Sequence, residues 1–189
     1  MIYINDQIAQ IQVDEVLPML SEQRRQVVLR FKHEQGRRLS AAAYLLLSEA
    51  LRQEFGIDER PVFAYRDNGK PFIEGRPDIH FNLSHCREAA ICAVSSRPVG
   101  VDIESIREYK EGLARYTMND DELQQIERAD RPDVAFIRLW TMKESLLKLT
   151  GEGIRNNMKT VLDMAEARVR FTTVVNLQHN YIYSICEHR

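Results

Sequence analysis

The sequence predicts an α+β fold, on two observations. Segments with helical periodicity and segments with strand composition come in blocks, and both kinds of block occur before and after the middle of the chain. The composition, with 44% hydrophobic and 29% charged residues, is typical of a globular protein. The 189 residues are enough for one domain, or for two small halves that share a core. The order of the blocks favours two α+β halves.

The chain begins with a predicted strand and continues with predicted helices. Apolar and polar residues alternate from Met1 to Gln12, which indicates a strand. Ser21 is a good N-cap for the helical segment that follows. Leucine and alanine recur at helical spacing from Glu34 to Phe55, and Gly56 is placed to end that helix.

Extended segments fill the middle of the chain. Asp67-Asn68-Gly69 is a strong turn signal with an extended segment on each side. Three further strands follow with short connectors, so we expect a β-meander. These strands are Ile79 to Ser84, Ala89 to Ser95 and Val99 to Glu104.

The second half of the chain is predicted to be helical and to end in strands. Helical patterns run from about Ile106 to Tyr116, from Asn119 to Arg128, and from a cap at Asp133 to about Leu149. Glycines follow the last of these helices and are expected to stop it. The tail has strand composition from Val169 to Val175 and from Tyr181 to Cys186.

Charge and composition exclude several classes of protein. The formal net charge of −2 gives no reason to expect a nucleic-acid partner. The first residues lack the pattern of a signal peptide, and no apolar stretch approaches the roughly 18 residues of a membrane span. Cys86, Cys92 and Cys186 match no zinc pattern and are expected to be reduced and structural. Reduced cysteines favour a cytoplasmic protein, and we expect it to be a monomer.

Two carboxylates stand two residues apart in the third strand of the expected meander. Because side chains alternate along a strand, Asp102 and Glu104 should share one face, while Val101 and Ile103 point into the core. Carboxylate oxygens are ligands that Mg²⁺ prefers. Taken alone, the pair also fits the solvated face of an edge strand.

The last helix offers a third carboxylate. Glu144 and Lys148 lie one turn apart on the same face, which alone also fits a surface ion pair. Lys143 most simply faces solvent. Two carboxylates on a strand, a third on a helix and a nearby lysine together suit phosphoryl chemistry.

Polar residues near two turns are candidates for binding phosphate. Ser84 can donate a hydrogen bond, and a protonated His85 would add positive charge. A turn with a surface histidine is the simpler interpretation of this segment alone. Lys70 on its own fits an incidental turn lysine, and Arg37 and Arg38 fit the solubilising face of a helix.

Four motifs in this order make the chain resemble a known family. The two most specific have the forms (V/I)G(V/I)D(I/V)E and WxxKESxxK. The motifs are Gly69-Lys70-Pro71, Asn82-Leu83-Ser84-His85, Gly100-Val101-Asp102-Ile103-Glu104 and Trp140-Thr141-Met142-Lys143-Glu144-Ser145-Leu146-Leu147-Lys148. With them the chain resembles the Sfp-type 4′-phosphopantetheinyl transferases, and the resemblance covers most of its length.

The resemblance implies a fold and a reaction. The fold would consist of two pseudo-equivalent α+β halves, residues 1–98 and 99–189, with the active site in the cleft between them. The enzyme would be of the holo-[acyl-carrier-protein] synthase type. It would transfer 4′-phosphopantetheine from coenzyme A to a serine of an apo acyl or peptidyl carrier protein and release adenosine 3′,5′-bisphosphate.

The resemblance also implies roles for the acidic residues. Glu144, as a metal ligand or its neighbour, would accept the serine proton, and Lys148 would supply positive charge during transfer. One further acidic position of the family falls on either Asp121 or Glu122. The implied Mg²⁺ ligands are Asp102, Glu104 and Glu144.

Basic and hydroxyl residues would bind coenzyme A. His85 would contact its 3′-phosphate and Lys148 its pyrophosphate. Lys70, Ser84 and Arg38 would lie along the nucleotide site, although the spacing before Arg38 differs from the family by about one residue. Because carrier proteins are acidic, a basic docking patch is also expected, to which Arg24, Arg25 and Arg37 are candidates to contribute.

Two other functions fit the same residues. One is a non-catalytic coenzyme A-binding protein that regulates a partner, and the other is a Mg²⁺-dependent hydrolase of pyrophosphate bonds. The presence of all three carboxylates and of Lys148 disfavours the first. The hydrolase would release product without any carrier protein, so assays with and without carrier distinguish the three.

Overall fold

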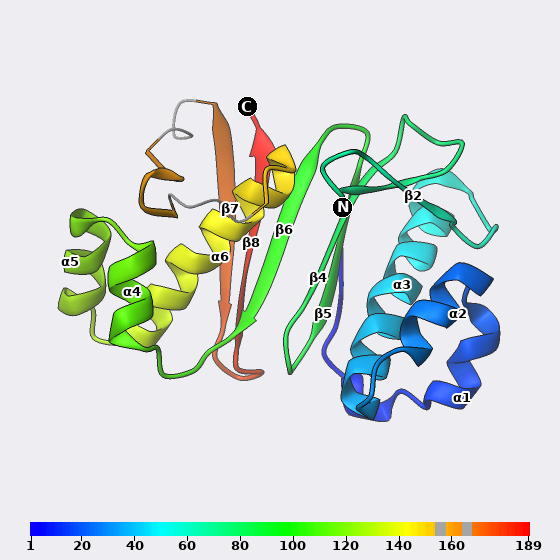
Figure 1. Ribbon diagram of the computed structural model, residues 1–189, viewed down its shortest axis with the longest axis horizontal. Coiled ribbons are helices and arrows are strands. Elements are labelled where there is room, and N and C mark those ends of the chain that lie inside the picture. Colours follow the sequence, from blue (N-terminus) through cyan, green and yellow to red (C-terminus); the bar gives the residue numbers. More distant parts are fainter. Residues whose placement is uncertain (154–157, 164–167) are drawn as a thin grey trace.

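The computed structural model describes residues 1–153, 158–163 and 168–189 and has an α+β architecture (Figure 1). Its helices are α1 (Val13–Val16), α2 (Glu22–Leu29), α3 (Glu34–Phe55), α4 (Glu111–Thr117), α5 (Asp120–Arg128) and α6 (Pro132–Thr150), with short 3₁₀ turns at Ile8–Gln10, Leu17–Met19 and Met158–Thr160. Its strands are β1 (Ile2–Asn5), β2 (Phe63–Tyr65), β3 (Pro71–Ile73), β4 (His80–His85), β5 (Ala90–Ser95), β6 (Val99–Ser105), β7 (Val169–Asn176) and β8 (Tyr181–His188).

Most predicted helix signals are confirmed. Helix α3 has the predicted bounds and ends at Gly56, whose φ of 64° is the left-handed conformation that glycine adopts readily. The Ser21 side chain accepts a hydrogen bond from the backbone N–H of Arg24, as expected of an N-cap. Asn119 and Glu122 form a complete capping box at the start of α5.

Three predicted boundaries are wrong. The first strand ends at Asn5, because the Asn5 side chain accepts a hydrogen bond from the N–H of Gln7 and turns the chain. Helix α4 begins at Glu111, because the N–H of Ile106 still bonds across to Asn180. Asp133 does not cap α6; it lies within the first turn and pairs with Arg131.

The strands form two three-stranded antiparallel sheets and one hairpin. The N-terminal sheet has the order β1-β5-β4 and packs against α3. The C-terminal sheet has the order β6-β8-β7 and packs against α6. Within the part of the chain that the structure describes, strands β2 and β3 pair only with each other. In Figure 1, α3 lies on one side of the strands of the N-terminal sheet, and α6 crosses the strands β7 and β8 of the C-terminal sheet.

The predicted meander is wrong at its third strand. Strands β4 and β5 pair as expected, but β6 pairs with β8 of the other sheet. Strand β6 still lies beside β4, as Figure 1 shows. The Asn82 side chain accepts a hydrogen bond from the N–H of Val101, and the Ser84 hydroxyl accepts one from the N–H of Ile103. Hydrogen bonds to side chains of β4 therefore replace a backbone ladder between β4 and β6. We call this boundary between the two sheets the seam.

Residues of β6 alternate between two environments, as the sequence predicts. Val101 and Ile103 are fully buried in an apolar cluster that includes Ile91 of β5 and Tyr181 of β8. The opposite face of β6 carries Asp102 and lies toward α6. The three cysteines are free and buried. Among the described residues, no helix is both long enough and apolar enough to cross a membrane.

Gly100 sets how closely α6 approaches β6. A Cβ atom at this position would lie 2.0 Å from the carbonyl oxygen of Ser145 and 2.6 Å from the backbone nitrogen of Leu149. These backbone atoms belong to the helix that carries Glu144 and Lys148, so a larger residue must push that helix away.

We expect Gly100→Ala to lower the free energy of unfolding by about 1–3 kcal/mol, the usual cost of overpacking. Urea denaturation measures this change. Gly112→Ala is the matched control, because nothing lies within 4 Å of a Cβ atom placed there in α4. The control should be neutral or slightly stabilising, by up to about 1 kcal/mol. Equal stability of Gly100→Ala and the wild type would contradict the close packing of β6 and α6.

Candidate active site

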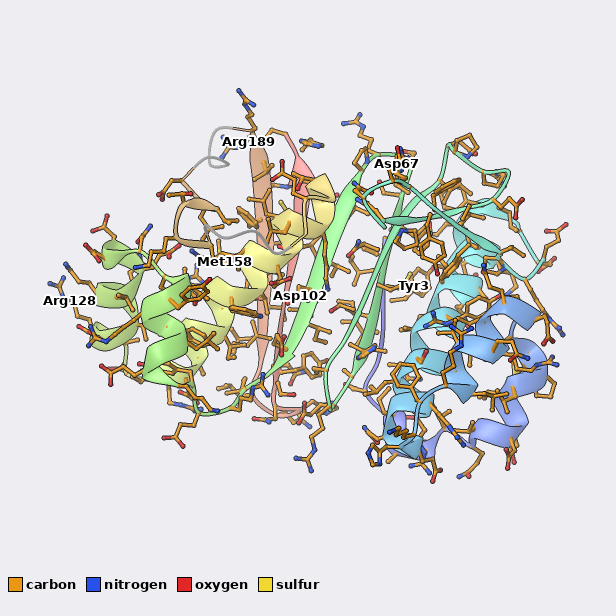
Figure 2. The ribbon with its side chains drawn as sticks, in the orientation of Figure 1. Tyr3, Asp67, Asp102, Arg128, Met158 and Arg189 are labelled. Atoms are coloured by element: carbon orange, nitrogen blue, oxygen red, sulfur yellow. The ribbon has the colours of Figure 1, made fainter. Side chains whose placement is uncertain are left out.

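Asp102, Ser84 and Lys148 form a hydrogen-bonded group where β4, β6 and α6 meet. The Lys148 ammonium donates to Asp102 Oδ1 at 2.6 Å and to Ser84 Oγ at 2.8 Å. Ser84 Oγ in turn donates to Asp102 Oδ1 at 2.8 Å. Asp102 is only 4% exposed, and Figure 2 shows it near the centre of the molecule. Residues from both sides of the seam therefore converge on one carboxylate.

Glu104 and Glu144 lie close enough to Asp102 to feel its charge. The pKa of Glu104 is raised mainly by burial and next by the negative charge of Asp102. The pKa of Glu144 is raised by the same two causes, in the same order, and the Lys148 ammonium opposes the rise. The three carboxylates repel one another at a partly buried site, which favours binding of a cation.

The donor atoms of this site fit a hard divalent cation. Asp102 Oδ2 and Glu144 Oε1 are buried, and neither has a hydrogen-bond partner within the described part of the chain. Unpartnered buried carboxylate oxygens are costly unless something binds them. Across residues 1–153, 158–163 and 168–189, no three acidic, histidine or cysteine side chains are already grouped as a metal cluster. The carboxylates would have to draw together around an ion, and in this structure Lys148 is the cation bound to Asp102.

A cavity of about 520 Å³ opens beside this group. It is polar at the acidic end and apolar along the wall formed by β2, β3 and α3. Glu144 is not among its lining residues. The cavity is lined by Arg24, Ala43, Phe63, Tyr65, Pro71, Leu83, Ser84, His85, Asp102, Glu104 and Lys148.

His85 and Arg24 are basic groups in the wall of this cavity. Loss of hydration lowers the pKa of His85, and the nearby Lys148 ammonium lowers it further. The Arg24 guanidinium donates to Ser40 and lies 5.9 Å from the centre of the Phe63 ring. Its Nε is buried and has no hydrogen-bond partner among the described residues. An anion bound in the cavity would accept hydrogen bonds from the Arg24 Nε–H and from the His85 imidazole.

Arg24 was predicted only as a possible docking residue, and the structure adds it to the cavity. Helix α2 begins at Glu22, directly after its N-cap Ser21, so Arg24 lies in the first turn of the helix. From there its side chain reaches Ser40 of α3. The only sequence signal was a basic residue one turn after a helix cap. That signal does not distinguish a binding residue from a surface one.

Two predicted nucleotide-site residues lie outside the cavity lining. The Arg38 guanidinium donates to Glu34 Oε1 at 2.5 Å and to the carbonyl of Ala9 at 3.2 Å. The Lys70 ammonium donates to the carbonyl oxygens of Lys148 and Leu149. Both side chains are thus engaged by protein groups.

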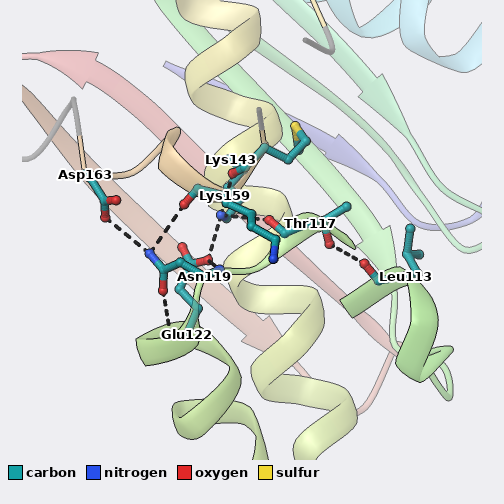
Figure 3. Close-up of polar contacts among 8 residues, drawn as sticks. Leu113, Thr117, Asn119, Glu122, Lys143, Lys159 and Asp163 are labelled. Carbon is teal, nitrogen blue, oxygen red and sulfur yellow. Dashed lines mark hydrogen bonds and ion pairs between the residues drawn. The ribbon is translucent and has the colours of Figure 1, made fainter. Parts of the chain in front are cut away.

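Lys143 is completely buried, so the expectation that it faces solvent is wrong. Its ammonium donates to Glu122 Oε2 at 2.7 Å, to the carbonyl of Met158 at 2.7 Å and to that of Thr117 at 3.1 Å (Figure 3). Burial lowers its pKa, and the hydrogen bond to Glu122 opposes the shift. Glu122 is 5% exposed whereas Asp121 is exposed, so of these two acids Glu122 is the one built into the fold.

A second cavity, of about 400 Å³, is also lined by Glu104. Tyr109, Phe136 and Trp140 give it an aromatic floor, and Glu104 lines both cavities. The complete lining is Glu104, Arg107, Glu108, Tyr109, Lys110, Leu113, Phe136, Ile137 and Trp140.

Comparison with known proteins agrees with the sequence motifs. A family model described as the 4′-phosphopantetheinyl transferase superfamily matches residues 98–187, which include Asp102, Glu104, Glu144 and Lys148. The chain is 32% identical over 154 residues to the 4′-phosphopantetheinyl transferase psf-1 of Bacillus pumilus, covering 80% of this chain and 66% of the relative.

Two relatives from Bacillus subtilis extend the comparison. The chain is 30% identical over 157 residues to a 4′-phosphopantetheinyl transferase of that species, covering 81% of this chain and 70% of the relative. It is 28% identical over 156 residues to the 4′-phosphopantetheinyl transferase Sfp of strain 168, with the same coverage. The matched part thus spans 66 to 70% of the length of these relatives. The chain belongs to the Sfp-type 4′-phosphopantetheinyl transferase family, the enzymes that transfer phosphopantetheine from coenzyme A to carrier proteins.

Proposed function

We propose that this chain carries out its transfer as a Mg²⁺-dependent reaction at the group formed by Asp102, Ser84 and Lys148. The observation that supports this most is the pair of buried oxygens on Asp102 and Glu144 that have no hydrogen-bond partner among the described residues. With Glu104, they would supply three carboxylates to the ion. When bound, Mg²⁺ would neutralise negative charge on the pyrophosphate of coenzyme A.

The protein residues would each do part of the phosphoryl transfer. The hydroxyl oxygen of the carrier serine forms a bond to the β-phosphorus of coenzyme A. The bond from that phosphorus to the bridging oxygen breaks, and adenosine 3′,5′-bisphosphate leaves with the bridging oxygen. Glu144 would accept the proton of the serine hydroxyl. Lys148 would stabilise the charge that develops on the leaving oxygen.

The two cavities suggest how the substrates approach. The cavity with Arg24 and His85 carries the basic groups that a phosphorylated nucleotide needs, and Tyr65 and Phe63 give it aromatic surface. The second cavity, which shares Glu104 with the first, would take the pantetheine arm and the carrier serine. Residues 1–98 and 99–189 would act as the two halves that enclose the cofactor.

The carrier protein is the proposed macromolecular partner, and we expect a cytoplasmic monomer to act on it. Of the three arginines considered for docking, Arg24 is turned into the cavity. Arg25 pairs with Glu22 at 3.2 Å, and Arg37 donates to the carbonyl of Phe31. Arg25 and Arg37 therefore remain the candidates for a basic docking surface.

One experiment separates this function from its two rivals. The protein is incubated with coenzyme A, Mg²⁺ and a panel of apo acyl and peptidyl carrier proteins, and the carriers are weighed by mass spectrometry. We expect one carrier to gain a phosphopantetheine group only when Mg²⁺ is present. Release of adenosine 3′,5′-bisphosphate without any carrier would instead indicate a hydrolase, and binding of coenzyme A without either product would indicate a regulator.

His85→Ala tests the placement of the nucleotide. Because His85 would contact the 3′-phosphate, its loss should weaken binding of coenzyme A by roughly tenfold, the effect of one charge-assisted hydrogen bond. Binding of dephospho-coenzyme A, which lacks that phosphate, should change much less. Calorimetric titration of both cofactors measures the difference. An equal loss for the two would argue against contact with the 3′-phosphate.

A further inference from the structure

Lys70 joins the β2–β3 hairpin to the end of helix α6. Its ammonium donates to the carbonyl oxygen of Lys148 at 2.7 Å and to that of Leu149 at 2.9 Å. These bonds connect residues 78 and 79 positions apart. The hairpin pairs with neither sheet, so this is a specific contact between an isolated hairpin and the helix that carries Lys148.

The contact completes the C-terminal end of α6. The last carbonyls of a helix have no partner within it. The N–H of Gly151, whose φ is 76°, donates to the carbonyl of Leu147 at 2.8 Å. Lys70 supplies donors to the next two carbonyls, and its positive charge lies at the negative end of the helix dipole.

The turn of the hairpin is fitted closely against this helix end. A Cβ atom on Gly151 would lie only 2.4 Å from Nδ2 of Asn68. The φ of 76° favours glycine at this position, and the Asn68 side chain of the turn lies directly against it. The same hairpin lines the larger cavity through Tyr65 and Pro71, the residue after Lys70.

We propose that Lys70 is a positioning residue for Lys148. By fixing the main chain of the last turn of α6, it holds the Lys148 ammonium against Asp102 and Ser84. Because Tyr65 and Pro71 belong to the same hairpin, the wall of the nucleotide cavity and the position of Lys148 are set by one unit. This role rests on the proposed function of Lys148 in the transfer, and it differs from direct contact between Lys70 and the nucleotide.

A double-mutant cycle tests this proposal. Lys70→Met, Lys148→Met and the double variant are compared in coenzyme A affinity by calorimetry and in kcat/KM of carrier modification. We expect Lys70→Met to lower kcat/KM by about tenfold or more, because small displacements of a catalytic group have effects of this size. In the Lys148→Met background the same change should lower kcat/KM by less than about twofold, because Lys70 would act through Lys148. A change below about twofold is within the scatter expected when two mutations do not interact.

Two variants control for effects on folding. Lys70→Arg keeps a cationic donor at the helix end and should restore most of the activity. Arg66→Met changes an exposed residue of the same hairpin, whose guanidinium lies over the Phe72 ring, and should stay within about twofold of the wild type. All assays are run well below the unfolding temperature of each variant.

The outcomes distinguish the alternatives. An equal loss from Lys70→Met in both backgrounds would overturn the proposal, since Lys70 would then act on the nucleotide or on the fold. Full activity of Lys70→Met would overturn it as well. If the wild type binds coenzyme A but transfers nothing, the proposed function fails, and the affinity cycle alone still decides the role of Lys70. A wild type that neither binds nor transfers would overturn both.

Discussion

Asp102→Asn should abolish phosphopantetheine transfer while leaving the fold intact. The substitution keeps the shape of the side chain but removes the charge that Lys148 contacts at 2.6 Å and that the ion would need. We expect a loss of at least about a thousandfold in kcat/KM, because the change removes both a ligand and the charge that orients Lys148. The measurement is the mass gained by the carrier, together with the circular dichroism spectrum of the variant.

Matched variants make this result specific. Asp14→Asn removes an exposed carboxylate from α1 and should leave transfer unchanged. Glu144→Ala should reproduce the loss seen at Asp102, because both would bind the ion. Full activity of either Asp102→Asn or Glu144→Ala would refute the metal assignment.

Lys143→Met should cause the largest loss of stability. The substitution leaves Glu122 buried without its cation and removes the ammonium that donates to the carbonyls of Thr117 and Met158. Breaking a buried ion pair by removing one partner costs about 3–5 kcal/mol. Chemical denaturation should show a fall of this size in the free energy of unfolding. The loss is expected because Lys143 no longer joins α5 and the turn at Met158–Thr160 to α6.

The double variant shows whether the cost comes from the uncompensated charge. Lys143→Met combined with Glu122→Gln should recover part of the stability, because no buried charge is then left alone. Lys32→Met, at an exposed lysine, should change the free energy of unfolding by less than about 0.5 kcal/mol. A Lys143→Met protein as stable as the wild type would contradict the buried network in Figure 3.

Local signals in the sequence predicted most helices and strands, because caps and periodicity act within a few residues. Gly56, Ser21 and Asn119 all mark helix ends that the structure has. The pairing of β6 was not predictable in this way. Its partner β8 is far away in the sequence, with Val99 paired to Glu187 and Ser105 to Tyr181, and short connectors favoured the nearer strand β5.

The site was predictable where a motif placed residues on one element and less so where it depended on packing. The alternation along β6 correctly placed Val101 and Ile103 in the core. Lys143 carries a charge and was expected in solvent, because its partner Glu122 lies on another helix. Arg24 gave no signal beyond its charge. The family of the chain was predicted correctly from its motifs, as the comparisons confirm.

The most direct test of the carboxylate site is binding of a divalent ion without any reaction. Mn²⁺ serves as a paramagnetic probe, and its free concentration is measured by electron paramagnetic resonance in the presence of coenzyme A. We expect the wild type and Asp14→Asn to bind one ion alike, and Asp102→Asn to bind it at least about a hundredfold more weakly. Equal affinity of Asp102→Asn and the wild type would contradict a metal site built on Asp102, Glu104 and Glu144.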